Sequence, residues 1–139
     1  MKLAQIMTRH LTTIGMDDTL AAIQAIFEKV GFHHLLVVSE DYEVAGIISD
    51  RDLLKEVSPY LNTASEQARD LSTLKKKAHQ VMSRRLVYGS PGTTVKEAAS
   101  LLMEHSISCL PVLDENRALV GIVTWKDILR FLLEDLSSS

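Results

Sequence analysis

Two spacings of hydrophobic residues alternate along the chain. Apolar residues recur every three or four positions in residues 17–31, DDTLAAIQAIFEKVG, and in residues 93–106, TTVKEAASLLMEHS, which predicts two amphipathic helices. Each is followed by two short, mostly apolar runs with an acidic turn between them: HLLVVSE and EVAGIIS in the first case, SCLPVLD and LVGIVT in the second. These runs predict paired strands. A further helical pattern follows each pair, from about Asp50 and from Trp125.

The helical spacing also predicts which side chains face the core. The predicted inward positions are Leu20, Ile23, Phe27 and Val30 in the first helix, Leu53, Leu54 and Val57 in the helix from Asp50, and Val95, Ala98, Leu102 and Met103 in the helix of residues 93–106. Asp17 or Asp18 is the predicted N-cap of the first helix, and Gly31 is its predicted C-terminal stop.

The order of elements occurs twice because the sequence itself repeats. Residues 6–54 align with residues 81–129 without a gap, so that Met7 falls on Met82 at a constant offset of 75 residues. Matched apolar positions in one unbroken register indicate a duplication. The chain is therefore expected to be built from two copies of one unit.

Each copy has the predicted order β-α-β-β-α. The predicted fold class is α/β in the broad sense of mixed helices and strands, and more narrowly α+β. Short apolar segments supply the first strand of each copy, and short helices are expected in KLAQIM and AHQVM just before them. The predicted boundaries are residues 1–58 for the first repeat, residues 59–77 for a helical linker, and residues 78–139 for the second repeat.

Composition narrows the class of protein. Fifteen Lys and Arg stand against 18 Asp and Glu, a net charge of −3, which argues against a nucleic-acid partner. There is no signal-peptide pattern, and no apolar run approaches the roughly 20 residues that span a bilayer, so we expect a cytoplasmic protein with no membrane partner. The single cysteine, Cys109, lies in an apolar run and is expected to be a small buried side chain.

No arrangement of residues indicates catalysis. The sequence has no nucleophile with a suitably spaced base and no glycine-rich phosphate loop, so we expect the protein not to be an enzyme. His33 and His34 are neighbours next to a predicted strand and would point to opposite faces, so we expect no metal site there.

The strand-to-helix corner has a pattern that fits a functional site, and it occurs twice, as GIISDRD and GIVTWKD. Ser49 precedes Asp52 by three residues, and Thr124 precedes Asp127 by the same spacing. One interpretation is a capping box, in which the hydroxyl and the carboxylate bind amides at the helix start. The other is a ligand site, in which the helix start binds an anion and the carboxylate accepts hydrogen bonds from two ribose hydroxyls. The residues alone leave both interpretations open.

The succession of a helix, a strand ending in LLVV or LPVL, an acidic turn and the corner GIISDRD or GIVTWKD resembles the CBS domain family. A tandem pair of these domains is called a Bateman module, and the layout is similar to that of stand-alone prokaryotic CBS proteins of the acetoin-utilisation accessory type. The first copy departs from the family pattern, with Leu36 where many members, and the second copy at Pro111, have proline.

The resemblance implies two repeats packed about a pseudo-twofold axis, with two clefts between them that bind adenosine-containing ligands. It assigns six residues to each cleft. One set is Ser49, Arg51, Asp52, Leu86, Val87 and Ser108, and the other set is Leu11, Thr12, His33, Thr124, Lys126 and Asp127. In each set the cation, Arg51 or Lys126, is expected to pair with phosphate.

These assignments predict a non-catalytic regulatory module that senses an adenine nucleotide and passes its occupancy to a dimer or partner interface. The expected ligand is AMP, ADP or ATP, with S-adenosylmethionine or NAD also compatible, and no cofactor is required. The resemblance implies a homodimer, with a protein effector of unknown identity. The alternative is a ligand-free CBS scaffold for dimerisation or docking, with Trp125, Phe131 and Leu132 as exposed contact residues.

Overall fold

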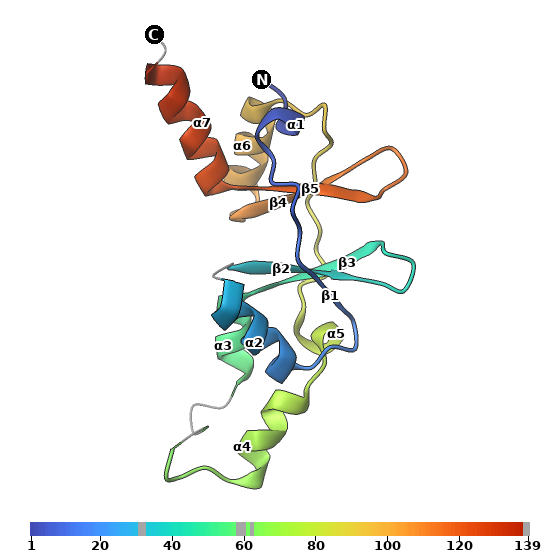
Figure 1. The fold of residues 1–139 in the computed structure, drawn as a ribbon, viewed down its shortest axis with the longest axis vertical. Helices are drawn as coiled ribbons and strands as arrows, with labels where there is room; N and C mark the ends of the chain where they lie inside the picture. Colours follow the sequence, from blue (N-terminus) through green and yellow to red (C-terminus); the bar gives the residue numbers. More distant parts are fainter. Residues whose placement is uncertain (31–32, 58–60, 62, 138–139) are drawn as a thin grey trace. The chain divides into compact units, whose positions relative to one another are not determined.

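The computed structural model describes residues 1–30, 33–57, 61 and 63–137, and the chain forms two compact units (Figure 1). The terminal unit combines Met1–Leu11 with Val87–Ser139, and the central unit is Thr12–Leu86. Helices and strands are mixed in both, as the sequence predicts. The compact units are not the same divisions as the predicted repeats, whose boundaries stay a prediction about the sequence.

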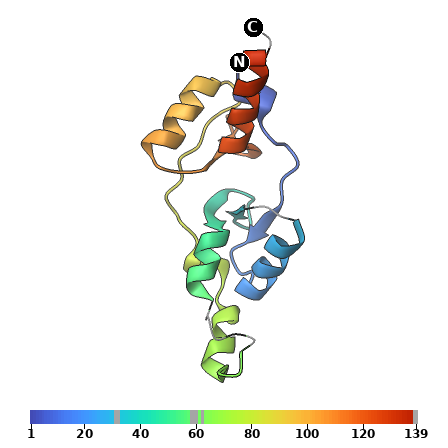
Figure 2. The same ribbon diagram turned by 90° about the vertical axis from the view of Figure 1, so that its left-hand side faces the viewer.

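The central unit contains a three-stranded sheet and its helices. Its elements are β1 (Thr13–Gly15), α2 (Leu20–Val30), β2 (His34–Val38), β3 (Val44–Ser49), α3 (Asp50–Glu56), α4 (Ala68–Ser72), a 3-10 helix η1 (Thr73–Lys75) and α5 (Ala78–Val81). Strand β1 is parallel to β2, and β2 is antiparallel to β3. Helices α2 and α3 lie side by side (Figure 2).

The terminal unit repeats this plan with a shorter sheet. Its elements are α1 (Leu3–Ile6), α6 (Val95–Glu104), β4 (Cys109–Leu113), β5 (Leu119–Thr124) and α7 (Trp125–Ser137). Strands β4 and β5 are antiparallel, with an irregularity between Val112 and Leu113 at the position that matches the one between Val37 and Val38.

The third strand predicted for the second repeat is reduced to a single parallel bridge between Gly89 and Val112. Gly89 donates its N–H to the carbonyl of Pro111, 2.9 Å away. The N–H and C=O of one strand residue point to the same side, so a residue other than proline here would offer a donor on that same side. Proline lacks this donor, which explains why pairing does not extend toward Val87.

Each unit has a hydrophobic core of its own. The terminal core contains Leu3, Met7, Val95, Ala98, Leu102, Leu110, Val112, Val123 and Ile128. The central core contains Ile14, Leu20, Ile23, Leu35, Val37, Ile48, Leu53, Ala78 and Met82. The buried position of Cys109 is confirmed, and burial raises the pKa of its thiol to about 12.

Three predictions of helix detail are wrong. Leu54 and Met103 are 75% and 69% exposed, because each lies one position beyond a buried residue and the helix turns it outward. The N-cap of α2 is Thr19, whose Oγ1 accepts the Ala22 N–H at 3.3 Å, while Asp18 accepts the N–H of Gly15 instead. Gly31, the predicted stop of α2, lies outside the described residues.

The two predicted short helices, α1 and α5, are confirmed. Each one packs in the compact unit that is otherwise formed by the other repeat. Helix α1 belongs to the terminal unit, where Leu3 donates its N–H to the carbonyl of Thr93 at 2.8 Å. Helix α5 belongs to the central unit, where Ala78 donates in the same way to Asp18 at 2.8 Å. We call this reciprocal arrangement the segment exchange.

The residues that follow each short helix pair with a strand of the same unit. Thr8 and Ile122 exchange N–H···O=C hydrogen bonds of 2.9 and 3.0 Å, and Ser83 and Ile47 exchange bonds of the same two lengths. The two pairs are related by the 75-residue offset with the roles of the repeats reversed. The duplication therefore extends to individual hydrogen bonds across the exchange.

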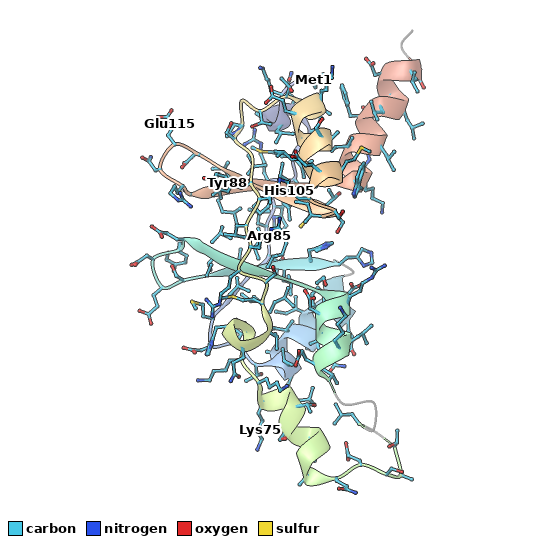
Figure 3. The ribbon with its side chains drawn as sticks, turned by 180° about the vertical axis from the view of Figure 1, so that it is seen from behind. Met1, Lys75, Arg85, Tyr88, His105 and Glu115 are labelled. Atoms are coloured by element: carbon cyan, nitrogen blue, oxygen red, sulfur yellow. The ribbon has the colours of Figure 1, made fainter. Side chains whose placement is uncertain are left out.

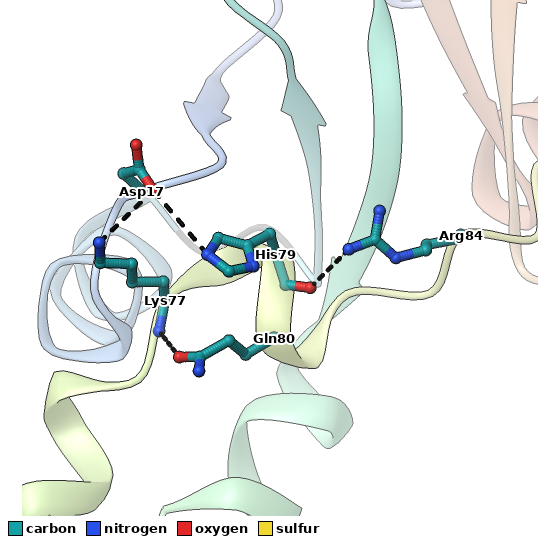
Figure 4. Close-up of polar contacts among 5 residues, drawn as sticks. All are labelled: Asp17, Lys77, His79, Gln80 and Arg84. Atoms are coloured by element: carbon teal, nitrogen blue, oxygen red, sulfur yellow. Dashed lines mark hydrogen bonds and ion pairs between the residues drawn. The ribbon is translucent and has the colours of Figure 1, made fainter.

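Polar side chains add to the docking of α5. Asp17 receives Lys77 Nζ at 3.6 Å and His79 Nε2 at 3.9 Å, and Gln80 caps the helix start by accepting the Lys77 N–H at 2.8 Å (Figure 4). Arg84 donates to the carbonyl of His79 at 3.0 Å, as Arg9 does to that of Ala4 at 2.9 Å.

Two glycines permit the close approach of the exchanged segments. A Cβ at Gly121 would lie 2.6 Å from Met7 Sδ, and a Cβ at Gly46 would lie 2.6 Å from Met82 Sδ and 2.7 Å from the carbonyl oxygen of Ser83. A methionine side chain adapts to new neighbours, but a backbone carbonyl that is already hydrogen-bonded in a strand pair does not.

Gly46→Ala is therefore expected to lower the free energy of unfolding by about 1–3 kcal/mol, and Gly121→Ala by less, because only the Met7 side chain must move. Chemical denaturation measures both. Gly15→Ala is the matched control, since its Cβ would meet nothing closer than 3.8 Å. Equal stability of all three variants would contradict the close approach.

Candidate functional site

The first corner joins β3 to α3 and forms a capping box. The N–H of Ser49 donates to Asp52 Oδ2 at 2.9 Å, and the N–H of Asp52 donates to Ser49 Oγ at 3.1 Å. Ser49, the last residue of β3, still has extended backbone angles, and its side chain caps the helix that begins at Asp50. The capping interpretation of this pair is confirmed.

The second corner joins β5 to α7 with the same bonds and one more. The Thr124 N–H donates to Asp127 Oδ2 at 2.9 Å, the Asp127 N–H donates to Thr124 Oγ1 at 3.3 Å, and the Thr124 hydroxyl lies 3.2 Å from Asp127 Oδ2. Asp127 is 9% exposed and is the one buried charged side chain among the described residues. A buried carboxylate requires such partners, because desolvation without them is costly.

Capping occupies one oxygen of each carboxylate. In both corners the hydrogen bonds to the helix start use Oδ2. The Oδ1 of Asp127 lies 3.6 Å from Arg130 Nη1, a residue that is largely exposed. A carboxylate has about four acceptor positions, so a capping aspartate keeps capacity for further donors. The two interpretations of the corner are therefore compatible.

Each corner also contacts the residue that precedes the neighbouring strand. Asp50 donates its N–H to the carbonyl of His33 at 2.9 Å, and Trp125 donates to that of Ser108 at 3.2 Å. His33 and Ser108 thus each lie beside the corner of their own unit. Their predicted pairing with the corner of the other repeat stays a prediction.

The first corner has an ionisable pair that the sequence analysis missed. His33 Nδ1 lies 3.0 Å from Asp50 Oδ2, and this hydrogen bond lowers the pKa of the Asp50 carboxyl. Both side chains face solvent. The sequence contained a signal for this pair. Asp50 lies in the first turn of a predicted helix, and His33 directly precedes the strand that pairs with the strand before that helix.

His34, the next residue, is half-buried in β2 opposite Ser49. Burial lowers the pKa of His34 below the usual 6.5 of a histidine, and this effect outweighs the charges of Asp50 and Asp52, which raise the pKa. The neutral imidazole is therefore favoured in the folded protein.

The remaining predicted site residues fall into two groups. Arg51 and Lys126 are exposed in the first turns of α3 and α7. Four half-buried residues lie where the chain passes from one unit to the other, namely Leu11, Thr12, Leu86 and Val87. The assignment of all of them to a ligand stays a prediction.

The segment after Val87 is held by an aromatic contact. The Arg117 guanidinium lies 5.5 Å from the ring centroid of Tyr88, beside the β4–β5 hairpin (Figure 3). A cation over a tyrosine face contributes about 0.5–1 kcal/mol at an exposed site. Sequence reasoning did not single out this pair, since its members are far apart in the chain.

Among the described residues there is neither a metal-binding cluster nor a helix that could cross a membrane. No group of three His, Cys, Asp or Glu side chains there is arranged to hold a metal ion. None of the helices in that part of the chain combines the length and apolarity needed to cross a membrane.

Comparison with known sequences identifies both repeats. A family model for the CBS domain matches residues 3–59 and again residues 78–134. A CBS domain-containing protein of Dictyostelium discoideum is 35% identical over 133 residues, which cover 95% of this chain and 91% of that protein. The chain also matches a homoserine O-acetyltransferase of Methanosarcina acetivorans at 29% identity, but it spans only 21% of that enzyme.

Solved structures give the same result for the fold. A Vibrio cholerae protein assigned to acetoin utilization, AcuB, is 27% identical with a TM-score of 0.81, over 99% of this chain and 93% of that one. The CBS domain pair of protein MJ0100, solved with 5′-methylthioadenosine and S-adenosyl-L-methionine, is 25% identical with a TM-score of 0.80, over 97% and 98% of the chains.

The lowered pKa of His34 predicts a pH dependence of stability. Between its folded pKa and 6.5 the unfolded chain binds more protons, so stability rises with pH across that window and falls as pH drops below 6.5. Thermal melts from pH 7.5 to pH 5 should show this fall, and His34→Gln should reduce it. His10→Gln, at an exposed histidine, is the control. Identical slopes for His34→Gln and the unmodified protein would contradict the assignment.

Proposed function

Because this chain belongs to the CBS domain family and has the domain twice, we propose that it is a regulatory module that binds an adenosine-containing ligand at its strand-to-helix corners. The observation that carries the proposal is the duplicated pair of hydroxyl and carboxylate at a helix start, Ser49 with Asp52 and Thr124 with Asp127. In both pairs the cap uses one carboxylate oxygen and leaves the other outside it.

The corner chemistry suits a nucleoside. Two vicinal ribose hydroxyls are donors placed side by side, and a carboxylate accepts both, as the acidic residue of dinucleotide-binding folds does. Arg51 and Lys126, which directly precede Asp52 and Asp127 in the first turns of α3 and α7, are exposed cations suited to a phosphate. AMP, ADP and ATP combine these groups. S-adenosylmethionine and NAD present the same ribose.

The related structure supports the nucleoside part of the proposal. The MJ0100 pair was solved with 5′-methylthioadenosine and S-adenosyl-L-methionine. These two molecules share an adenosine and lack a phosphate, so their common feature is the one that the carboxylate would recognise. We therefore propose that Asp52 and Asp127 contact the ribose, and we expect the phosphate contact to differ from one ligand to another.

The two corners are proposed to differ in affinity. Asp127 is buried and lies near Arg130, whereas Asp52 is half-buried and has the His33–Asp50 pair beside it. A carboxylate near a permanent cation is a weaker acceptor for a neutral hydroxyl than one without. We expect Asp52 to form the tighter ribose contact.

Regulation would follow from linkage. A ligand changes the balance between two states of the protein only as far as it binds one state better than the other. The proposed module has no reaction of its own, and occupancy would act on a dimer or effector interface. Turnover of a nucleotide by the purified protein would contradict this part of the proposal.

A second candidate function is a ligand-free scaffold for dimerisation or docking. The exposed side chains of Trp125 and Leu132 on α7 favour it. Phe131, the third predicted contact residue, is instead half-buried against the terminal core, so its prediction as an exposed residue is wrong.

Isothermal titration with AMP, ADP, ATP, NADH and S-adenosylmethionine tests the proposal. At least one should bind, and Asp52→Ala or Asp127→Ala should weaken it by about tenfold or more, since each loses charge-assisted hydrogen bonds worth about 1.5–3 kcal/mol. Thr94→Ala is the matched control. It removes the cap hydroxyl of α6, which accepts the Glu97 N–H at 3.1 Å, so it lowers stability without touching either corner.

The control separates a lost ligand contact from a lost helix cap. Weaker binding by the aspartate variants alone supports the ribose contact. If Thr94→Ala lost as much affinity as the aspartate variants, the lower affinity would be due to lower stability of the protein and not to a lost ligand contact. No binding of any of the five ligands by the unmodified protein would contradict the proposal and favour the scaffold.

A further inference from the structure

The two corners have different charges although their capping bonds match. At the 75-residue offset, the hydroxyl, the acid and two cations are kept, as Ser49 with Thr124, Asp52 with Asp127, Arg51 with Lys126 and Lys55 with Arg130. The charge differs at two other matched positions of the same helices, Asp50 with Trp125 and Glu56 with Phe131. A ligand bound in the same way at both corners would therefore meet a different charge at each.

Asp50 is the charge difference that lies at the corner itself. Glu56 is the last residue of α3, and it receives Lys76 Nζ at 2.9 Å, so its charge is compensated. His34 adds no charge at neutral pH, because burial lowers its pKa. Asp50 is the first residue of α3, and its match at the start of α7 is the uncharged Trp125. The first corner is therefore the more acidic of the two.

The Asp50 carboxylate is fixed and ionised. His33 Nδ1 lies 3.0 Å from Asp50 Oδ2, and this hydrogen bond is the main reason that the pKa of the Asp50 carboxyl is lowered. The charges of Asp50 and Asp52 both raise the pKa of His34 against the larger effect of burial, so the two carboxylates share one neighbourhood. At neutral pH a second negative charge thus lies near the proposed ribose acceptor.

In the second corner an uncharged side chain makes the corresponding contact. Trp125 Nε1 donates to the carbonyl of Ile107 at 3.1 Å, which ties the first residue of α7 to the segment before β4. Asp50 is tied in the same way to His33 in front of β2. Each contact joins a helix start to the segment before the paired strand. The two contacts differ in that only the first one leaves a carboxylate beside the corner.

The cations one turn into each helix increase the difference. Arg130 Nη1 lies 3.6 Å from Asp127 Oδ1 in the second corner. Lys55 matches Arg130, but within the described part of the chain no ion pair joins it to Asp52. The second corner thus has a cation next to its acceptor and no second acid, and such a site favours an anionic group.

Adenosine ligands differ in charge at one atom, C5′ of the ribose. AMP has a phosphate there, which is an anion, and S-adenosylmethionine has a sulfonium, which is a cation. The 2′ and 3′ hydroxyls, which the corner carboxylate would accept, are the same in both. Exposed charges are screened only beyond about 30 Å at 0.01 M salt, so a C5′ group on a ribose bound at Asp52 lies well within range of Asp50.

We propose that Asp50 is a specificity-determining residue: the first corner takes an adenosine ligand with a cationic group on C5′, such as a sulfonium, and the second corner takes an adenosine phosphate. The inference rests on the proposed function, because it assigns a ligand class to each of the same two corners. Asp50 acts through its charge and needs no contact with the ligand. Arg51, the cation of the first corner, has an acid on each side of it in the sequence.

Three probes that differ only at C5′ test the assignment: adenosine, AMP and 5′-amino-5′-deoxyadenosine, whose ammonium is a cation. In NMR titrations of the unmodified protein, the amide signals of Asp52 and Asp127 report on the two corners, since both N–H groups donate to the cap hydroxyls. At pH 7.5 and about 10 mM salt, the ratio of ammonium to phosphate affinity should be about tenfold higher at the first corner than at the second.

Matched variants isolate the charge of Asp50. Asp50→Asn keeps an acceptor for His33 and should lower that ratio at the first corner by about fivefold. Trp125→Asp should raise the ratio at the second corner, and Trp125→Asn, which also loses the indole but adds no charge, should not. Asp41→Asn is the control for net charge. It removes an exposed acid from the turn between β2 and β3, at the other end of β3, and should leave both ratios unchanged.

Salt gives a readout that a purely structural role of Asp50 would not change. Raising the salt concentration to about 0.5 M screens exposed charges, so the ratios at the two corners should converge. A difference that arose from the shape of the corners would persist. This comparison uses the unmodified protein, so it remains decisive even where a Trp125 variant folds poorly.

The outcomes separate the inference from the function on which it rests. No shift of either corner amide with any probe would overturn both. Binding of adenosine with the same ratio at the two corners, or with ratios that neither Asp50→Asn nor salt changes, would overturn the inference alone. A higher ratio at the first corner that falls in Asp50→Asn and in salt supports it.

Discussion

The contact of a methionine with a strand glycine, made once in each unit, is the constraint on which the rest of the structure depends. Met7 packs against Gly121 and Met82 packs against Gly46, and each methionine follows a short helix that comes from the other repeat. Without these contacts neither core is complete, because both methionines are core residues. The two repeats are therefore coupled through their cores before any ligand is considered.

The exchange also determines where the corners lie. Thr8 pairs with Ile122 two residues before Thr124, and Ser83 pairs with Ile47 two residues before Ser49. The strand that ends in each corner is thus held on its free side by a segment of the other repeat. Each corner combines this rigid strand end with a capped helix start, which is the support that a precise ligand contact needs.

In the corners, helix capping and the proposed ligand contact use the same two carboxylate side chains, Asp52 and Asp127. The carboxylates of Asp52 and Asp127 start their helices and are also the proposed ribose acceptors. A capping acid could be replaced by many residues in a protein that needed only a helix start. The duplication repeats the acid together with the hydroxyl three residues earlier, and this arrangement is compatible with both the cap and the proposed ribose contact.

Much of the fold follows from the sequence because local patterns determine it. The gap-free repeat predicted the strand pairs and both short helices, and the period of the apolar residues located their elements. A capping box was one of the two interpretations that it left open for each corner. Apolar spacing does not say which unit a four-residue helix packs against, so the exchange of α1 and α5 was not predicted. It also placed Leu54 and Met103 inside, although each lies one position beyond a buried residue.

At the candidate site, the sequence indicated the paired Ser49 with Asp52 and Thr124 with Asp127, since spacing along one helix turn is a local property. The pairing of His33 with Asp50 was missed because it joins a residue before one strand to a helix that follows the next strand. The reduced third strand of the second repeat was also missed. Its cause, the absent N–H of Pro111, acts only once the neighbouring strand is in place.

Amide hydrogen exchange under native conditions tests the segment exchange most directly. It would be measured on the unmodified protein and on the variants Met7→Ala and Met82→Ala. Met7 lies in the first repeat, but the account predicts that its truncation speeds amide exchange at Val123 and Ile128 of the terminal unit and leaves Val37 and Ile48 of the central unit protected. Met82→Ala should give the reverse pattern. Loss of protection at Val37 and Ile48 in Met7→Ala, or at Val123 and Ile128 in Met82→Ala, would contradict the account.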